Sequence, residues 1–195
     1  MVPTSKKIKF EKLTWEVESC ESCSLCAGAK NHVMGEGNLD SHVVFLGEAP
    51  GRREDETGRP FVGSAGNLLD QLLTGVNLSR CGVFITNVVR CRPPRNRKPR
   101  REEITACSTH IERLLEIIEP EIIAPMGNSA LEHVFERFGI EKSQIGSAHG
   151  EAYKVEAPWG KVIVYPLYHP AAAIYNRRLL GDLKRDMAAL AKFLS

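Results

Sequence analysis

The sequence contains no run of about 18 consecutive apolar residues, the length that a helix needs to cross a membrane. Three lysines lie between Met1 and Phe10, but no apolar segment follows them, so this stretch does not resemble a signal peptide. Low-complexity linkers and internal repeats are also missing. We therefore expect one intracellular, cytoplasmic domain over residues 1–195, in which residues 1–10 can be flexible, and no contact with a membrane.

A strong net charge is missing as well, because the formal charge is only +2. The basic residues are nevertheless unevenly placed, and residues 90–101 hold seven Lys or Arg side chains and no acidic one. A local patch of this kind favours contact with nucleic-acid phosphates, although a solvated loop would have the same composition.

Six cysteines in an intracellular chain argue against a disulfide framework and favour a metal site. Cys20 and Cys23 form a C-x2-C step, and fifteen residues separate Cys91 from Cys107. Thiolates from these two regions suit a [4Fe–4S] cluster or a structural zinc ion. Zinc ribbons usually have two C-x2-C steps, so the single step favours iron and sulfur. Cys107 and Cys81 could instead be buried core thiols.

Four short apolar runs rich in Val and Ile predict strands that are buried on both faces of a parallel sheet. They cover residues 42–46, 82–89, 121–126 and 161–168. Apolar residues at helical spacing predict helices over residues 64–73, 102–118, 128–138 and 179–194, the first capped by Ser64. The alternation predicts a single-domain α/β fold, a three-layer α/β/α sandwich with a four-stranded, mainly parallel sheet.

Polar or glycine-rich sequence marks the carboxyl ends of three of the predicted strands, at residues 47–51, 86–87 and 168–170. Because ligands of open parallel sheets bind beyond the carboxyl ends of the strands, we expect these positions to converge. The Asn87 amide can read the edge of a base, and His169 can donate to a developing anion. A turn-forming Asn and a structural His are the alternatives. Residues 54–63 predict an ordered functional loop, although Phe61 within it could be a core residue.

These motifs resemble those of the family 4 uracil-DNA glycosylases. The matching segments cover residues 47–51, 57–63, 65–66, 85–89, 91–94, 96–97, 107 and 169–171, and the similarity runs from about Cys20 to the C-terminus. The resemblance implies an enzyme that flips uracil out of DNA and hydrolyses its N-glycosidic bond, leaving an abasic site for base excision repair. Its substrate would be uracil-containing single- or double-stranded DNA, and we expect it to act as a monomer.

For the metal site, the resemblance implies a [4Fe–4S] cluster on Cys20, Cys23, Cys91 and Cys107. Cys26 extends the first motif to C-x2-C-x2-C, which leaves open which thiols are ligands. We favour Cys20 because family members keep the outer pair while the third position varies. The cluster is expected to be structural. Its two ligand-bearing chain segments flank the basic loop, so the cluster could fix that loop against phosphates.

For the pocket, the resemblance implies that Phe61 stacks on the flipped base and that Asn87 hydrogen-bonds the uracil edge and rejects cytosine. His169 would stabilise negative charge on uracil O2 as the bond breaks. His169 is therefore the first catalytic candidate.

The group that activates the attacking water stays open. Ala49 stands where other uracil glycosylases often carry Asp or Asn, and a methyl group cannot activate water. Either Glu48 or Glu54 could supply a carboxylate, or stabilisation of the leaving group could suffice. Glu48 and Ala49 are also expected to line the substrate pocket.

Two surface segments are expected to contact DNA. Arg95, Arg97 and Lys98 of the basic loop would bind phosphates. The loop that follows the predicted catalytic His has an apolar tip at Ala173 and Ile174, which suits insertion into the minor groove, although core burial is a comparable reading for Ile174.

Two other functions remain open at this level. A non-enzymatic iron–sulfur protein that binds DNA or senses redox state would keep the cysteines and the basic loop. It would not need Glu48, Phe61, Asn87 and His169 together at the strand ends. The second alternative is a glycosylase whose main substrate is a different damaged base.

Overall fold

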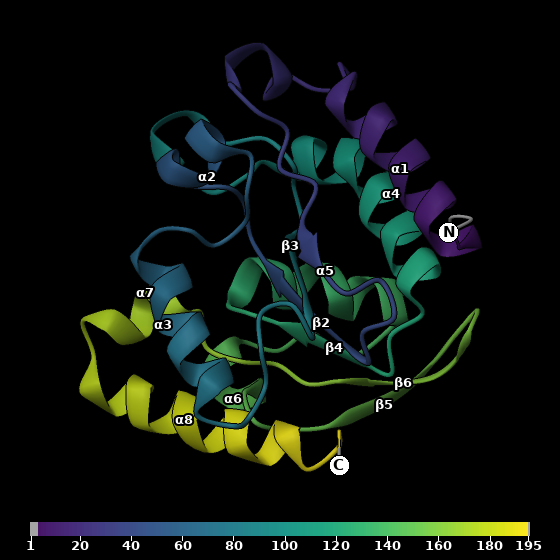
Figure 1. The fold of residues 1–195 in the computed structure, drawn as a ribbon. Helices are drawn as coiled ribbons and strands as arrows, with labels where there is room; N and C mark the ends of the chain where they lie inside the picture. Colours follow the sequence, from purple (N-terminus) through teal and green to yellow (C-terminus); the bar gives the residue numbers. More distant parts are fainter. Residues whose placement is uncertain (1–3, 195) are drawn as a thin grey trace.

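A six-stranded sheet runs through the centre of the computed structural model, which describes residues 4–194 (Figure 1). The strands are β1 (Glu36–Gly37), β2 (Val43–Gly47), β3 (Phe84–Asn87), β4 (Ile122–Pro125), β5 (Tyr153–Ala157) and β6 (Gly160–Val164). Their order across the sheet is β1-β3-β2-β4-β6-β5. The inner four are parallel, and β1 and β5 pair antiparallel at the two edges. The four predicted strands are the inner four.

The two edge strands correct the predicted strand count from four to six. Every residue of β2, β3 and β4 is buried, and this burial on both faces selects the continuous Val- and Ile-rich runs. In β5, half-buried and exposed side chains alternate instead, because an edge strand is covered on one face only. The strand β1 has two residues, too few to produce a pattern.

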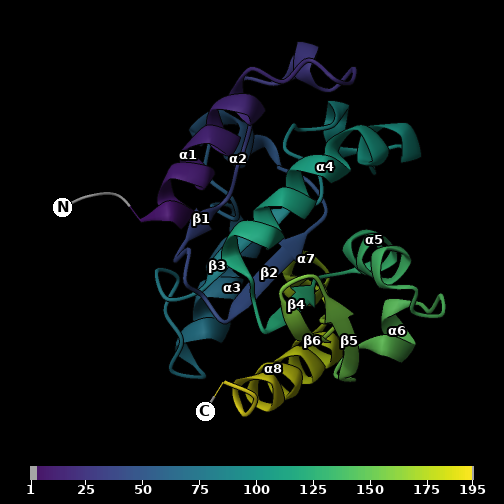
Figure 2. The same ribbon diagram turned by 90° about the vertical axis from the view of Figure 1, so that its right-hand side faces the viewer.

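Helices cover both faces of the sheet and complete the predicted α/β/α sandwich (Figures 1 and 2). The helices are α1 (Ser5–Glu18), α2 (Arg52–Thr57), α3 (Ser64–Thr74), α4 (Arg101–Ile118), α5 (Asn128–Phe138), α6 (Ile145–Ala148), α7 (Pro170–Ile174) and α8 (Arg177–Ala191), with 3-10 turns η1 (Cys26–Gly28) and η2 (Pro94–Asn96). Side chains of α1, α4 and α5 pack on one face of the sheet, and those of α3, α7 and α8 on the other. The four predicted helices are α3, α4, α5 and α8.

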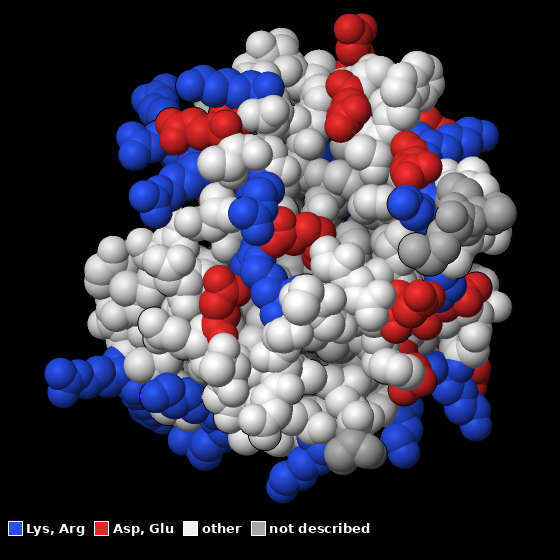
Figure 3. All heavy atoms as spheres, viewed as in Figure 1, with Lys and Arg blue, Asp and Glu red and all other residues white. Residues whose placement is uncertain are grey.

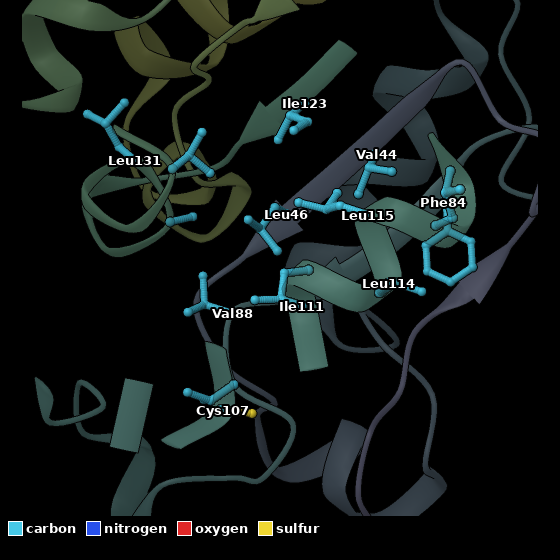
Figure 4. Close-up of a cluster of buried hydrophobic side chains, with 14 of the residues drawn as sticks. Val44, Leu46, Phe84, Val88, Cys107, Ile111, Leu114, Leu115, Ile123 and Leu131 are labelled. Atoms are coloured by element: carbon cyan, nitrogen blue, oxygen red, sulfur yellow. The ribbon is translucent and has the colours of Figure 1, made fainter. Parts of the chain in front are cut away.

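The core beneath α4 positions one of the cysteines. Ile111, Leu114 and Leu115 lie on the buried stripe of α4 and pack in one cluster with Leu46 of β2 (Figure 4). Each fully buried aliphatic side chain contributes about 1.5–3 kcal/mol to folding. Cys107 lies one turn before Ile111 on the same stripe, so core packing fixes where its thiol lies.

Two helix starts differ from the sequence prediction. Ser64 is the first residue of α3, and Gly63 before it occupies the cap position without a side-chain cap, so the prediction that Ser64 caps this helix is wrong. Helix α1 begins at Ser5 with Thr4 as its cap, so the part of residues 1–10 that the structure describes is largely helical. Residues 1–3 lie outside the described part. Within residues 4–194, no helix combines the length and apolarity needed to cross a membrane.

Candidate active site and metal centre

A cavity of about 780 Å³ opens where the carboxyl ends of the central strands meet the loops that follow them. It brings together six side chains that the sequence predicted as pocket residues, namely Glu48, Ala49, Glu54, Phe61, Asn87 and His169. These residues come from segments more than 120 positions apart in the chain. Their convergence follows from the parallel order of β2, β3, β4 and β6, which sends all four carboxyl ends to one edge.

Gly47, the last residue of β2, lets two pocket side chains approach each other. A Cβ atom on Gly47 would lie 2.4 Å from Asn87 Oδ1 and 2.6 Å from Phe61 Cζ. Both distances are far shorter than a van der Waals contact. Only glycine therefore allows the Asn87 carboxamide and the Phe61 ring to close over the end of β2.

Phe61 is held in a strained conformation by its neighbours. Its φ of +49° lies in the left-handed region, which costs a non-glycine residue about 1–3 kcal/mol. Arg80 donates from Nη1 to the Phe61 carbonyl at 3.1 Å and to Asp70 Oδ1 at 2.9 Å, and it also donates to the Pro60 carbonyl. A Cβ on Gly66 would lie 1.7 Å from the Phe61 oxygen, so α3 packs directly on this turn.

His169 faces Phe61 as a neutral ring with a defined tautomer. The two ring centroids are 5.7 Å apart and the ring planes are inclined by 29°. The backbone N–H of Ala171 donates to His169 Nδ1 at 3.1 Å, so the neutral imidazole carries its proton on Nε2. Burial lowers the pKa of His169 to about 4, with a smaller opposing effect from Glu54. At neutral pH the ring is therefore an uncharged N–H donor.

The two candidate carboxylates have different surroundings. Glu54 Oε1 accepts hydrogen bonds from the backbone N–H groups of Val62 and Gly63, both at 2.9 Å. It thus orders the loop that carries Phe61, just before α3 begins. Glu48 Oε2 accepts from the Ser129 hydroxyl, and within residues 4–194 its other oxygen has no hydrogen-bond partner. Among the described residues, each carboxylate therefore has one oxygen without a hydrogen-bond partner, Oε1 in Glu48 and Oε2 in Glu54, and they differ in that Glu54 Oε1 holds two backbone N–H groups.

Ala49 lies beside Glu48 in the cavity wall and packs partly against the core. Its methyl group adds apolar surface to the pocket but no titratable group. The structure thus places Ala49 where the sequence predicted it, as a lining residue.

The basic loop is more internally paired than its composition suggests. Arg97 forms two hydrogen bonds to Glu103, at 2.6 and 2.8 Å, and the Arg97 guanidinium is the main reason that the pKa of Glu103 falls to about 2. Glu103 is only 1% exposed, so this pair braces the loop against α4. Lys98 lies 3.4 Å from Glu132. Arg95 is exposed and forms no ion pair within the described residues, which makes it the best placed of the three to bind phosphate.

Arg52 and Arg53 of α2 are exposed cations that the sequence analysis missed, and both line the cavity mouth. Figure 3 shows Lys and Arg side chains gathered over α2 and its neighbouring loop, at the upper left, and again beside α7 and α8, at the lower left. Arg52 and Arg53 are followed directly by acidic residues in α2, in the order Arg-Arg-Glu-Asp-Glu. The sequence therefore shows no run of basic residues there like that of residues 90–101.

The segment after His169 corrects one predicted DNA contact. Ala173 is 1% exposed and packs in the core between α7 and α8, so its assignment as a DNA contact is wrong. Ile174 is 38% exposed and Tyr175 is 93% exposed. The apolar tip of this segment therefore consists of Ile174 and Tyr175, because the short helix α7 turns the Ala173 methyl group inward.

Five of the six cysteines line one small void between the N-terminal segment and α4. They are Cys20, Cys23, Cys26, Cys91 and Cys107, and all are free thiols. Burial raises the pKa values of the Cys91 and Cys107 thiols, and repulsion from the neighbouring thiols adds to both shifts. The remaining one, Cys81, is exposed beside Ser79. The predicted ligands thus share one site, together with Cys26.

The residues around the void suit an anionic, sulfur-bound group. Arg90 lines the void, is 1% exposed, and two of its nitrogens have no hydrogen-bond partner in the described chain. A negatively charged cluster of thiolates would balance this buried cation. In residues 4–194, no three His, Cys, Asp or Glu side chains are close enough together to hold a single metal ion. The five thiols and the unpaired Arg90 cation are compatible with a [4Fe–4S] cluster.

Comparisons with known proteins show the family of this chain. The model of the Uracil DNA glycosylase superfamily matches residues 34–193. A type-4 uracil-DNA glycosylase of Sulfurisphaera tokodaii is 46% identical over 178 residues, which are 91% of this chain and 81% of the relative. Type-4 uracil-DNA glycosylases of Saccharolobus solfataricus and Archaeoglobus fulgidus are 43% and 42% identical, over 92% and 94% of this chain and 84% and 92% of theirs.

Proposed function

The chain belongs to the uracil DNA glycosylase superfamily, and from that premise we propose that it flips uracil out of DNA and hydrolyses the N-glycosidic bond, leaving an abasic site. The observation that carries the proposal is the cavity in which Phe61, Asn87 and His169 meet. A protein that only binds DNA has no use for these three side chains in one enclosed site. We also propose that the whole chain acts as one domain, as a monomer, in the cytoplasm.

Asn87 supports selection of uracil. Its side chain is buried, and within the described residues nothing hydrogen-bonds the carboxamide, so its donor and its acceptor are free for a ligand. Uracil offers an N3–H donor and an O4 acceptor on the matching edge. Cytosine offers an acceptor and an amino donor at these positions, so both contacts would be reversed. Phe61 supplies an aromatic face against which the base can stack.

His169 supports departure of the base as an anion. Because its Nδ1 accepts from Ala171, its Nε2–H is the group that can donate to uracil O2. Charge on O2 grows as the glycosidic bond breaks, so this contact is stronger in the transition state than in the bound substrate. A neutral ring suits the role, since it is ready at physiological pH without a proton from solvent.

Glu48 is our choice for the carboxylate that positions the attacking water. The Ser129 hydroxyl holds Glu48 Oε2, which leaves Oε1 for a water molecule in the cavity. The Glu54 carboxylate is already engaged by two backbone N–H groups, which suits a positioning role for the Phe61 loop.

Cys20, Cys23, Cys91 and Cys107 would hold the [4Fe–4S] cluster, and Cys26 is the fifth thiol at the same void. When bound, the cluster would supply a rigid crosslink between two chain segments, which is a structural contribution and not a step of the reaction. Arg95 and the exposed residues Ile174 and Tyr175 would contact the DNA around the flipped nucleotide.

A direct test incubates the purified protein with duplex oligonucleotides that carry U·G, T·G or C·G at one position. Alkali then cleaves the strand wherever an abasic site has formed. We expect strand cleavage with the U·G duplex and none with the others. Binding to the U·G duplex without any cleavage would favour the non-enzymatic alternative, and cleavage of the C·G duplex would contradict the assigned role of Asn87. Thymine has the same N3–H and O4 groups as uracil, so the T·G duplex tests exclusion of the C5 methyl group and not the Asn87 contact.

A further inference from the structure

Arg90 is a buried cation without an anionic partner in the part of the chain that the structure describes. Its side chain is 1% exposed, and its Nε and Nη2 atoms have no hydrogen-bond acceptor. No carboxylate pairs with it among the described residues. A guanidinium in this condition is strongly destabilising unless a negative group is supplied, because breaking or omitting one half of a buried ion pair leaves an uncompensated charge.

The groups that can supply this charge are thiolates. Arg90 lines the same void as Cys91 and Cys107, together with the other three thiols of this site. Four thiolates around a [4Fe–4S] core carry a net charge of about −2 in its common oxidised state, which provides the missing counter-charge.

On its other side, the same guanidinium holds the end of β3. Arg90 Nη1 donates to the Asn87 carbonyl at 2.9 Å and to the Thr86 hydroxyl. The Thr86 hydroxyl in turn donates to the Met34 carbonyl at 2.9 Å. Asn87 is the residue whose carboxamide faces the substrate cavity. One buried side chain thus touches both the wall of the cysteine void and the backbone of the base-reading residue.

We propose that Arg90 is a positioning residue that joins these two sites, balancing the charge of the cluster thiolates and fixing Asn87 for uracil recognition. The inference rests on the proposed function, because it needs both the cluster and the uracil pocket. Arg90 acts through its neighbours and touches neither the reacting atoms nor the substrate.

The test compares wild type with Arg90→Met, which removes the charge, and Arg90→Lys, which keeps the charge but loses the planar fork of donors. The first measurement is the midpoint potential of the cluster by protein-film voltammetry. The second is the dissociation constant for free uracil by NMR titration, which needs no turnover. Arg92→Met is the matched control, because Arg92 flanks Cys91 on the other side and bonds Asn96 at 2.7 Å instead of lining the void.

We expect Arg90→Met to move the potential to more negative values, because a reduced cluster loses a compensating cation. Arg90→Lys should stay near wild type in potential, and Arg92→Met should not shift it. Both Arg90 variants should bind free uracil roughly tenfold more weakly, the effect of losing a charged hydrogen bond to the Asn87 carbonyl. A folded Arg90→Met chain that loses its iron while Arg90→Lys keeps it would also support the charge role.

Four results would overturn the inference. A more positive midpoint potential of the cluster in Arg90→Met would mean that entry of solvent outweighs the lost cation. An unchanged midpoint potential would mean that the Arg90 charge does not act on the cluster. Equal loss of iron from both folded Arg90 variants would also remove the charge argument. Unchanged uracil binding in both would break the link to Asn87. A colourless wild type rejects the proposed cofactor itself, and a coloured wild type that excises no uracil rejects the proposed activity, so these failures are distinguishable.

Discussion

The His169 imidazole lies against the ring of Phe61, with 5.7 Å between the centroids and 29° between the planes, and its Nδ1 accepts the Ala171 N–H. This one arrangement bears on both the tautomer of His169 and its low pKa, because the half-buried ring lies beside an aromatic face and its only described hydrogen bond is accepted from an N–H donor. The proton on Nε2 is therefore a property of the folded chain before any substrate binds.

The low pKa of His169 predicts how stability depends on pH. The folded pKa is about 4, below the ordinary value of 6.5, so the unfolded chain binds a proton that the folded chain does not. The contribution to stability is complete above pH 6.5 and is lost as the pH falls toward 4. We expect His169→Asn, which keeps a cap for α7 but does not titrate there, to show a shallower fall in unfolding free energy over this range.

Urea unfolding at several pH values measures that difference. Burial also lowers the pKa of His133 to about 4, so part of the wild-type slope should remain in the His169 variant. Identical slopes for wild type and His169→Asn would contradict the burial argument for His169.

Asn87→Asp tests the reading of the base edge. An ionised Asp can accept a hydrogen bond from the cytosine amino group but repels the uracil O4, so preference should move from uracil toward cytosine. We expect excision of uracil to fall by 10²-fold or more, roughly the loss of one or two hydrogen bonds to the base. Single-turnover assays with U·G and C·G duplexes measure both rates. Asn87→Ala is the control, and should lose uracil excision without any gain on cytosine.

The two carboxylates of the pocket should respond differently to the same change. Glu48→Gln removes the proposed water-positioning charge and should lower the maximal rate by about 10²–10³, with little effect on stability. Glu54→Gln keeps an oxygen for the Val62 and Gly63 amides but loses the charge that strengthens these two hydrogen bonds, so it should lower the melting temperature and weaken base binding. Equal rate losses in two equally stable variants would show that Glu48 has no special role.

The Arg97–Glu103 ion pair should stabilise the folded chain. Arg97→Ala leaves Glu103 buried without its main partner, and we expect a loss of about 1–3 kcal/mol in unfolding free energy. Lys98→Ala, at an exposed pair with Glu132, should lose less than 1 kcal/mol. Arg95→Ala should instead reduce the salt dependence of DNA binding by roughly 0.9 in log–log slope, at unchanged stability. An Arg97 variant as stable as Lys98→Ala would contradict the brace.

The central strands and the pocket residues at their ends could be predicted from the sequence for one reason, the complete burial of these strands. Complete burial of β2, β3 and β4 selects apolar runs, and the residues after such runs, Glu48 and Asn87, stand out as polar interruptions. The edge strand β5 carries a mixed pattern because it is covered on one face, so it was missed.

Other features depend on distant partners that a sequence pattern does not reveal. Ser129 acts on Glu48 from 81 positions away, and Arg80 holds the Phe61 loop from 19 away. Nothing in the local sequence of either residue marks it. Ala173 was misassigned because an apolar loop next to a predicted catalytic residue has the same composition whether it points outward or, as in α7, inward.

The central claim is that His169 stabilises the departing uracil anion while the DNA is held elsewhere. The most direct test is the single-turnover excision rate on a U·G duplex for wild type and His169→Ala, measured beside gel-shift affinity for undamaged duplex. We predict a rate loss of about 10²–10³ in the variant, with unchanged affinity for undamaged DNA. A His169→Ala enzyme as fast as wild type, or one whose rate loss is matched by lost DNA affinity, would contradict this account.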